Sequence, residues 1–312
     1  MLLVPAGCGR YKPRPGQLPP SGTVLFVIGP SEFDPRWPAL RGGVRRALRE
    51  APYLKGEFVN VQSPDHADLE SLVQLGLDHQ ARALCIYSDD ATADRAAIAR
   101  AAGGGKTVIL MGGALEAEGA TGLVRVDLIG GAGLLSDKLG GVAGGRLSYA
   151  LLHASGTSEL GTRCFQSFGR NPLDRPSLRL LEERAISGDA AAWQDAVQQT
   201  VRRFPNVGLV VTLDPRPWLH EAPRLRLPAA NCFVTLGAAP NLWPRLRSGE
   251  AAALVGALDG EVGYAAGRMA IAALIGAELE STERIIPCEL VTAANLDDFA
   301  RRYSEAGELG SN

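Results

Sequence analysis

Apolar runs of strand length alternate with amphipathic stretches of helix length along most of the chain, and this alternation limits the fold more than any other feature. The first run, residues 23–29, is continuous, rich in β-branched residues and followed by Gly-Pro, as expected of a strand that is buried on both faces. A helical pattern follows over 37–50, where Leu40, Val44 and Leu48 form one apolar face. Repetition of this strand–helix unit predicts a parallel sheet.

The same unit continues toward the C-terminus. We expect further strands at 58–61, 83–87, 108–111, 123–127, 147–153, 178–186, 208–212, 232–236 and 254–257, and further helices at 65–80, 91–102, 129–140, 158–169, 190–204 and 261–275. At 312 residues, of which 46% are hydrophobic, the chain exceeds the size at which one core keeps growing. The predicted fold class is therefore α/β, with two Rossmann-like, doubly wound parallel-sheet lobes in tandem.

Charge and residue usage exclude several classes of protein. Thirty-two basic and 34 acidic side chains give a net charge of -2, so nucleic acid is not an expected partner. The five cysteines form no C-x-x-C pair and the four histidines lie far apart, which predicts neither a zinc site nor a redox pair. The glycine-rich stretch 103–107 leads into a strand and does not open a helix, unlike a phosphate-binding loop. We expect no cofactor, no metal, no catalytic constellation and no membrane-spanning segment.

The N-terminus resembles the end of a bacterial lipoprotein signal. Small residues, Ala6 and Gly7, precede Cys8, although Pro5 stands where leucine is usual and the apolar stretch is short. An ordinary frayed terminus is the alternative interpretation. On the lipoprotein interpretation Cys8 is lipidated, and residues 1–22 are a signal remnant and a proline-rich and glycine-rich linker.

Several short motifs follow one another in an order that is typical of one family. They are Asp34-Pro35-Arg36-Trp37 after the first strand, Val126-Asp127 before a glycine-rich helix start, Gly156-Thr157-Ser158 with Arg163, the strand 204–211, and the closing stretch 246–276 with Asp259 to Tyr264 inside it. In this order they resemble the type I periplasmic sugar-binding proteins, the ribose-binding-like group. The resemblance covers roughly residues 22–300.

The resemblance implies a Venus-flytrap architecture with three hinge crossings, in which a ligand lies between the carboxyl ends of both sheets. The first lobe is then 23–127 plus 258–284, the second 128–257 plus 285–303, and 304–312 form a tail. The implied function is the substrate-binding component of an ABC importer. Its partners are a small, sugar-like ligand and an ABC permease, and it is periplasmic, touching the membrane only through a lipid anchor.

The resemblance also implies a set of ligand-binding residues, which are Asp34, Arg36, Trp37, Asp90, Asp127, Arg163 and Asp214. Trp37 stands where the family places a stacking aromatic ring, and Asp90 matches a carboxylate that accepts hydrogen bonds from sugar hydroxyls. Each has a structural alternative. Trp37 fits a hydrophobic staple, Asp34 and Asp90 fit helix caps, and Arg163 fits a solvated helix charge.

Three positions depart from the family's polar pattern. Leu213 stands where the family carries Asn, Gly237 where it carries Asp, and Ala257 where it carries Gln. Their loss makes the site poor for ribose or galactose, so the ligand is less polar or anionic, or the lobes serve another role. Two other functions remain open. One is the effector-sensing domain of a regulator with the same fold, and the other is an enzyme on a Rossmann-like fold.

Overall fold

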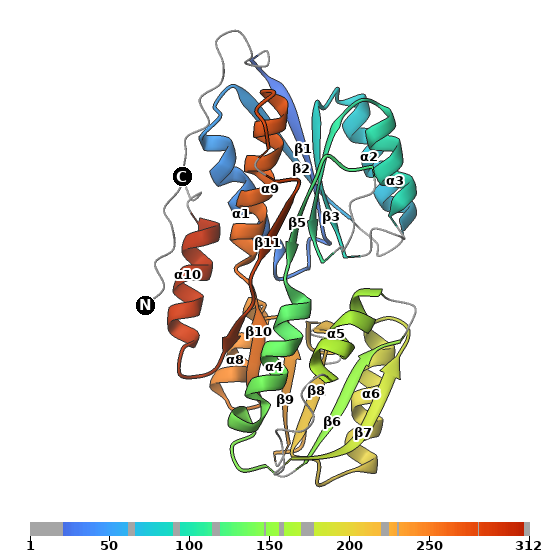
Figure 1. The fold of residues 1–312 in the computed structure, drawn as a ribbon, viewed down its shortest axis with the longest axis vertical. Helices are drawn as coiled ribbons and strands as arrows, with labels where there is room; N and C mark the ends of the chain where they lie inside the picture. The colour runs from blue at the N-terminus through green and yellow to red at the C-terminus, as the bar shows by residue number, and fades with distance from the viewer. Residues whose placement is uncertain are drawn as a thin grey trace.

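The computed structural model describes most of the chain as two lobes, each built around one six-stranded sheet (Figure 1). The described residues are 21–61, 66–89, 94–113, 119–146, 148–155, 159–169, 178–219, 225–229, 231–279 and 281–308. The predicted fold class, two doubly wound α/β lobes, is confirmed.

The first sheet has the strand order β11-β5-β4-β3-β1-β2, and its paired strands all run parallel. Its strands are β1 (Thr23–Gly29), β2 (Leu54–Asn60), β3 (Ala83–Ser88), β4 (Thr107–Gly112), β5 (Gly122–Val126) and β11 (Glu283–Ile286). Helices α1 (Trp37–Arg49) and α9 (Asp259–Leu274) pack on one face. Helices α2 (His66–Asp78) and α3 (Arg95–Gly103) pack on the other. Both faces are therefore apolar, as the continuous runs in the strands predict.

The second sheet has the order β12-β10-β9-β8-β6-β7, and only β12 is antiparallel to its neighbour among these described strands. Its strands are β6 (Ser148–Ala154), β7 (Arg179–Ile186), β8 (Leu209–Thr212), β9 (Cys232–Leu236), β10 (Ala251–Gly256) and β12 (Glu289–Val291). Helices α4 (Leu128–Val142) and α5 (Glu159–Gly169) cover one face. Helices α6 (Ala190–Arg203), α7 (Arg216–Leu219), α8 (Trp243–Arg247) and α10 (Leu296–Glu308) cover the other.

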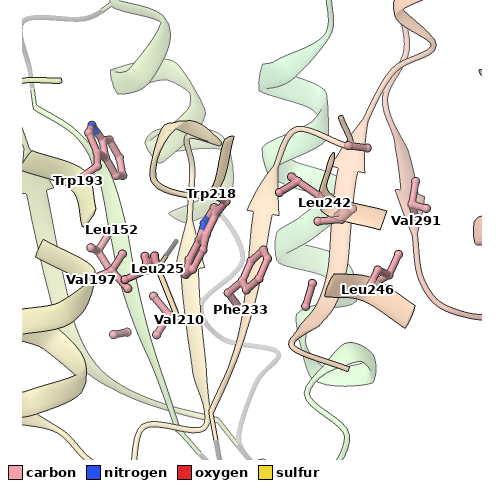
Figure 2. Close-up of a cluster of buried hydrophobic side chains, with 14 of the residues drawn as sticks. Leu152, Trp193, Val197, Val210, Trp218, Leu225, Phe233, Leu242, Leu246 and Val291 are labelled. Atoms are coloured by element: carbon pink, nitrogen blue, oxygen red, sulfur yellow. The ribbon is translucent and has the colours of Figure 1, made fainter. Parts of the chain in front are cut away.

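Aromatic side chains fill the core on the α6 side of the second sheet. Trp218 stacks on Phe233 with ring centroids 3.9 Å apart, and Trp193 lies among the aliphatic residues nearby (Figure 2). The indole nitrogen of Trp218 also donates a hydrogen bond to Oγ1 of Thr212, 2.8 Å away. The short helix α7 is therefore anchored by a buried aromatic residue.

The chain passes between the lobes at residues 127, 257–258 and 287–288. The first two passages lie at the carboxyl ends of β5 and β10, so these two ends face each other. At the third passage, Ile285 and Ile286 still pair with β5 in the first sheet, so the chain leaves the first lobe after residue 286. The lobe bounds expected from the sequence placed this passage between residues 284 and 285. All three passages lie where Figure 1 shows the two lobes meeting.

Helix α10 packs against both lobes. Phe299 and Tyr303 lie in the second-lobe core, and both contact the ring of Trp243 edge-on. Farther along, Gly307 lies against α1 so closely that a Cβ on Gly42 would come within 1.8 Å of its carbonyl oxygen. The sequence suggested a tail from residue 304, but residues 304–308 continue helix α10.

Each strand and helix predicted above overlaps an observed one. The largest shifts are at the starts of β2, which begins at Leu54 and not at 58, and of α3, which begins at Arg95 and not at 91. The short elements β11, β12 and α8 were not predicted, because three to five residues carry too little periodicity. The longer helix α10 was not predicted either, because many of its residues are charged.

Candidate functional site at the junction of the lobes

The turn between β1 and α1 is built by Asp34. Its carboxylate accepts the backbone N–H of Arg36 at 2.9 Å, and it also accepts the guanidinium Nε at 3.0 Å and Nη2 at 2.7 Å. Pro35, between them, fixes one backbone angle of this turn. The arrangement holds the guanidinium against its own aspartate, and we call this pair the first-lobe clamp.

Asp89, directly after β3, lies beside this clamp. The hydroxyl of Tyr87 donates to both carboxylate oxygens at 2.8 Å, and the backbone N–H of Gly113 donates to Oδ1 at 3.1 Å. The guanidinium of Arg36 lies over the ring of Tyr87, and its Nη2 is 3.7 Å from Oδ2 of Asp89. More than half of the Asp89 side chain is exposed, at 54%. The first lobe thus presents a rigid, solvent-facing carboxylate.

Tyr87 is held as a hydrogen-bond donor. Burial, aided by the negative charges of Asp89 and Asp34, raises its pKa well above the usual value, although Arg36 acts in the opposite direction. The phenol therefore keeps its proton at neutral pH and continues to donate to Asp89.

The second lobe repeats the clamp. Asp214, after β8, accepts the backbone N–H of Arg216 at 2.8 Å, its Nε at 2.9 Å and its Nη2 at 2.7 Å. The intervening residue is again proline, so Asp-Pro-Arg recurs with the same geometry. Nη1 of Arg216 also donates to the carbonyl of Gly188 at 3.0 Å. We call this pair the second-lobe clamp.

A carboxylate of the first lobe acts on the second-lobe clamp across the junction. Burial lowers the pKa of Arg216, but the interactions with Asp214, Asp89 and Asp189 raise it by more, so the pKa is raised overall. Since Asp89 belongs to the first lobe, its field reaches the second-lobe clamp. The lobes also touch nearby, because a Cβ on Gly113 would lie 3.3 Å from a methyl group of Leu160 in α5. The clamps therefore share one interlobe region.

Asp259 lies at the base of this region, at the start of α9. It accepts a hydrogen bond of 2.7 Å from the hydroxyl of Tyr303 on α10. Burial raises the pKa of Asp259 to about 6, and the negative charges of Asp34 and Asp89 add to this effect. The positive charge of Arg36 and the hydrogen bond from Tyr303 lower the pKa and oppose it. The interlobe region is acidic on balance.

The other residues predicted from the sequence fall into three groups. Trp37 is 3% exposed in the first-lobe core, where a Cβ on Gly29 would come within 2.4 Å of its ring, so it is a packing residue and offers no free face for stacking. Asp127 caps α4 by accepting the N–H of Gly130 at 2.9 Å, and Arg163 pairs with Glu159 on the surface of α5. Asp90 and Cys8 lie outside the described residues.

The three departures from the family pattern have a structural cause. Leu213 and Ala257 are each 6% exposed and lie in apolar clusters. Gly237 has a φ of +110°, and a Cβ there would come within 2.7 Å of Pro215 in the second-lobe clamp. The clamp therefore occupies the space that an aspartate at 237 needs.

The sequence pattern missed three residues of this region, which are Phe33, Asp89 and Arg216. Phe33 is 85% exposed in the turn after β1, although large apolar side chains are normally buried. Its position one residue before the first Asp-Pro-Arg was a usable signal. Recurrence of Asp-Pro-Arg at 214–216 was another.

Other features of the described residues do not compete with this region. A surface hollow lies between α2 and α3, lined by Glu70, Ser71, Gln74, Leu75, Asp78 and Arg100, and contains none of the residues above. Within the described ranges, no three His, Cys, Asp or Glu side chains are grouped to hold a metal ion. No described helix is long and apolar enough to cross a membrane.

Comparison with known proteins supports the fold. No protein-family model and no curated protein matches the sequence. Among solved structures, an ABC transporter solute-binding protein from Bacillus halodurans with bound myo-inositol has a TM-score of 0.73 at 15% identity, covering 92% of this chain and 100% of that one. Another from Burkholderia graminis with D-arabinose has a TM-score of 0.74 at 14% identity, covering 89% and 98%. An arabinose-binding protein from Geobacillus stearothermophilus has a TM-score of 0.73 at 15% identity, covering 90% of this chain and 99% of that one. The chain therefore has the two-lobed fold of the solute-binding proteins of ABC transporters.

Proposed function

We propose that this protein is the substrate-binding component of an ABC importer, and that it holds a small polyhydroxylated ligand between its lobes without chemical change. The observation that most supports this proposal is the position of the polar groups. Asp89 and Arg36 of the first lobe and Arg216 of the second lie at carboxyl ends of strands, where open α/β sheets bind ligands. The similar solved structures are solute-binding proteins and not enzymes, which supports this proposal.

Each part of the interlobe region has a role in this proposal. The exposed carboxylate of Asp89 accepts hydrogen bonds from ligand hydroxyls, and the remaining N–H groups of Arg36 and Arg216 donate to ligand oxygens. The exposed ring of Phe33 offers an apolar face against a ligand ring. Rotation of the lobes about residues 127, 257–258 and 287–288 then closes them over the ligand.

Calorimetry with neutral sugars, cyclitols and nucleosides tests this proposal, with small-angle scattering as a second readout. We expect saturable binding of one class and a smaller radius of gyration when that class is bound. Asp89→Ala should weaken binding at least about tenfold, because it removes a charged acceptor. Asp297→Ala, at an exposed carboxylate on α10, is the control and should leave the affinity unchanged. Absence of binding across the panel would contradict the proposal.

We further propose that Cys8 carries a lipid that anchors the protein outside the inner membrane, next to its permease. The support is the Ala6-Gly7-Cys8 sequence. Expressed from its native upstream DNA in a diderm host, the protein should incorporate labelled palmitate and fractionate with membranes, and Cys8→Ser should lose both properties. Labelling that survives this substitution would overturn the anchor while leaving ligand binding untouched.

A further inference from the structure

Helix α10 is anchored in the second lobe by its first two turns. Leu296 and Phe299 are buried in the core of that lobe. The guanidinium of Arg302 binds both carboxylate oxygens of Glu289 on β12, at 2.6 and 2.7 Å. Because Glu289 directly follows the third passage between the lobes, this bidentate pair fixes α10 beside the hinge. The helix therefore moves with the second lobe.

The last turn of α10 instead packs on the first lobe, where backbone meets backbone (Figure 1). A Cβ on Gly42 of α1 would lie 1.8 Å from the carbonyl oxygen of Gly307. A Cβ on Gly260 of α9 would lie 2.5 Å from the carbonyl carbon of Ala306. We call these contacts of α10 with α1 and α9 the seam. Since no side chains lie between the backbones, the seam cannot adapt by changes of rotamer when the lobes turn.

Two hydrogen bonds also cross the seam. The hydroxyl of Tyr303 on α10 donates to Oδ2 of Asp259 on α9 at 2.7 Å, and Nη1 of Arg46 on α1 donates to the carbonyl of Ala306 at 3.2 Å. Burial and the charge of Asp259 raise the pKa of Tyr303 well above its usual value, so the hydroxyl keeps its proton. Asp259 directly follows the passage at residues 257–258, so the seam lies next to the hinge.

A different contact between the lobes indicates which rotation the seam resists. A Cβ on Gly113, directly after β4, would lie 3.3 Å from a methyl group of Leu160 and 3.7 Å from one of Leu128, both in the second lobe. The lobes therefore already touch at this point, which limits any rotation that brings them closer together there. The rotation that the seam resists is opening.

We propose that α10 is a strap across the hinge, which holds the two lobes near the observed arrangement and keeps the ligand-free protein from opening widely. When the lobes open, the second lobe carries α10 with it, so that both hydrogen bonds break and the seam separates. A protein held near this arrangement uses less binding free energy for closure. The strap goes beyond the proposed function, because it concerns the resting angle between the lobes and not the ligand.

Interlobe distances in the ligand-free protein test the strap. Nitroxide labels are attached through p-acetylphenylalanine at Ala99 on α3 and Gln199 on α6, two exposed positions in different lobes, so that the cysteines stay unmodified. Pulsed electron paramagnetic resonance should give one narrow distance distribution for the wild type. In the double variant with Tyr303→Phe and Arg46→Met, the population at longer distances should rise about tenfold, since two hydrogen bonds that favour the resting arrangement are lost.

Three control substitutions separate the strap from a general loss of packing. Glu261→Gln removes the ion pair that Arg46 makes within the first lobe but leaves the hydrogen bond to Ala306. Tyr149→Phe removes a hydroxyl from β6 of the second lobe, away from the seam. Arg301→Gln changes an arginine whose ion pairs lie within α10 itself. All three should leave the distance distribution unchanged.

Melting temperatures verify that the variants are folded. A folded double variant with the wild-type distribution, or a wild type that already samples a broad range of distances, overturns the strap. If the double variant does not fold, the single substitutions Tyr303→Phe and Arg46→Met decide. Each should raise the population at longer distances about threefold, and no change in either overturns the strap. No ligand is present, so the result is independent of the proposed function.

Discussion

The two lobes carry the same Asp-Pro-Arg clamp in different surroundings. In each, the aspartate holds the backbone N–H and the guanidinium of the arginine two residues later, at nearly equal distances. Around Arg36 there is a further carboxylate, Asp89, 3.7 Å away. Around Arg216 the nearby Leu213 is buried, and the further carboxylates whose charges act on the arginine are Asp89 of the first lobe and Asp189 of its own lobe. Local sequence therefore sets the conformation of the clamp, while its neighbours set what the lobe offers to a ligand.

A second parallel between the lobes is the tryptophan that follows each clamp. Trp37 is 3% exposed and Trp218 is 2% exposed, so both indoles belong to a lobe core. They fasten the clamped turn to the sheet beneath it. This similarity is the part of the comparison that predicts the largest effects on stability.

Replacing either tryptophan by alanine should lower the free energy of unfolding by about 3–5 kcal/mol, because each removes a large ring from a packed core. Chemical denaturation measures this loss. The ligand affinity of the folded Trp37→Ala protein should stay within about threefold of the wild type, since the ring is buried against Gly29. A large loss of affinity in a folded variant would instead restore the stacking role that the sequence suggested for Trp37.

Burial of Asp259, together with the carboxylates around the first-lobe clamp, predicts a pH-dependent stability. Asp259 has a pKa of about 6 in the folded protein and 3.8 as its ordinary value, so the folded state takes up this proton first as the pH falls. Its charge therefore destabilises the fold above pH 6, and the cost disappears as the pH falls from 6 toward 4. Asp259→Asn should raise the free energy of unfolding at pH 7 by about 2 kcal/mol.

Denaturation of wild type and Asp259→Asn at several pH values checks this sign. The difference between the two proteins should shrink from pH 7 to pH 4, because the wild-type carboxyl becomes neutral over that range. Asparagine keeps an oxygen that accepts the hydrogen bond from Tyr303, so the comparison isolates the charge. A difference that is constant with pH, or that grows on acidification, would contradict the assignment.

Breaking the first-lobe clamp should lower the free energy of unfolding more than breaking the second-lobe clamp. Asp34→Ala removes the main partner of Arg36, which is 23% exposed, and should lower the free energy of unfolding by about 2 kcal/mol. Asp214→Ala should cost about 1 kcal/mol, because Arg216 is 42% exposed and keeps the carbonyl of Gly188. Denaturation curves of both variants measure the difference, and a reversed order would show that exposure does not set the cost.

The sequence predicted the fold well because the parallel strands are buried on both faces and read as unbroken apolar runs. Residues 23–29 and 83–87 are examples, and both lie at the predicted positions in the sheet. The role of α10 could not be predicted, because its packing against α1 depends on the backbone of Gly307 meeting Gly42, far away in the sequence. Such a contact leaves no periodic signal in either segment.

The candidate site was predicted less completely. Asp34, Arg36 and Asp214 do lie in the interlobe region, but the resemblance suggested separate ligand contacts and not arginine clamps. Trp37 points into the core because Gly29 leaves room for its ring, and no feature of the Asp-Pro-Arg-Trp motif reveals that direction. Side-chain roles at strand ends depend on which neighbours meet there, and those neighbours come from other strands.

The smallest expected difference concerns the hydrogen bond of one tryptophan. Trp218 donates from its indole nitrogen to Oγ1 of Thr212 at 2.8 Å inside the core, and Thr212 itself donates to Thr235. Trp218→Phe removes this donor and should cost about 1 kcal/mol beyond the cost of the smaller ring, since a buried oxygen loses a partner. Trp37→Phe, at an indole without such a bond among the described residues, should show only the packing cost. Denaturation measures the losses in the free energy of unfolding for Trp218→Phe and Trp37→Phe. The extra loss for Trp218→Phe should vanish in a Thr212→Val background, because that background has no Oγ1 of Thr212 to lose its hydrogen-bond donor.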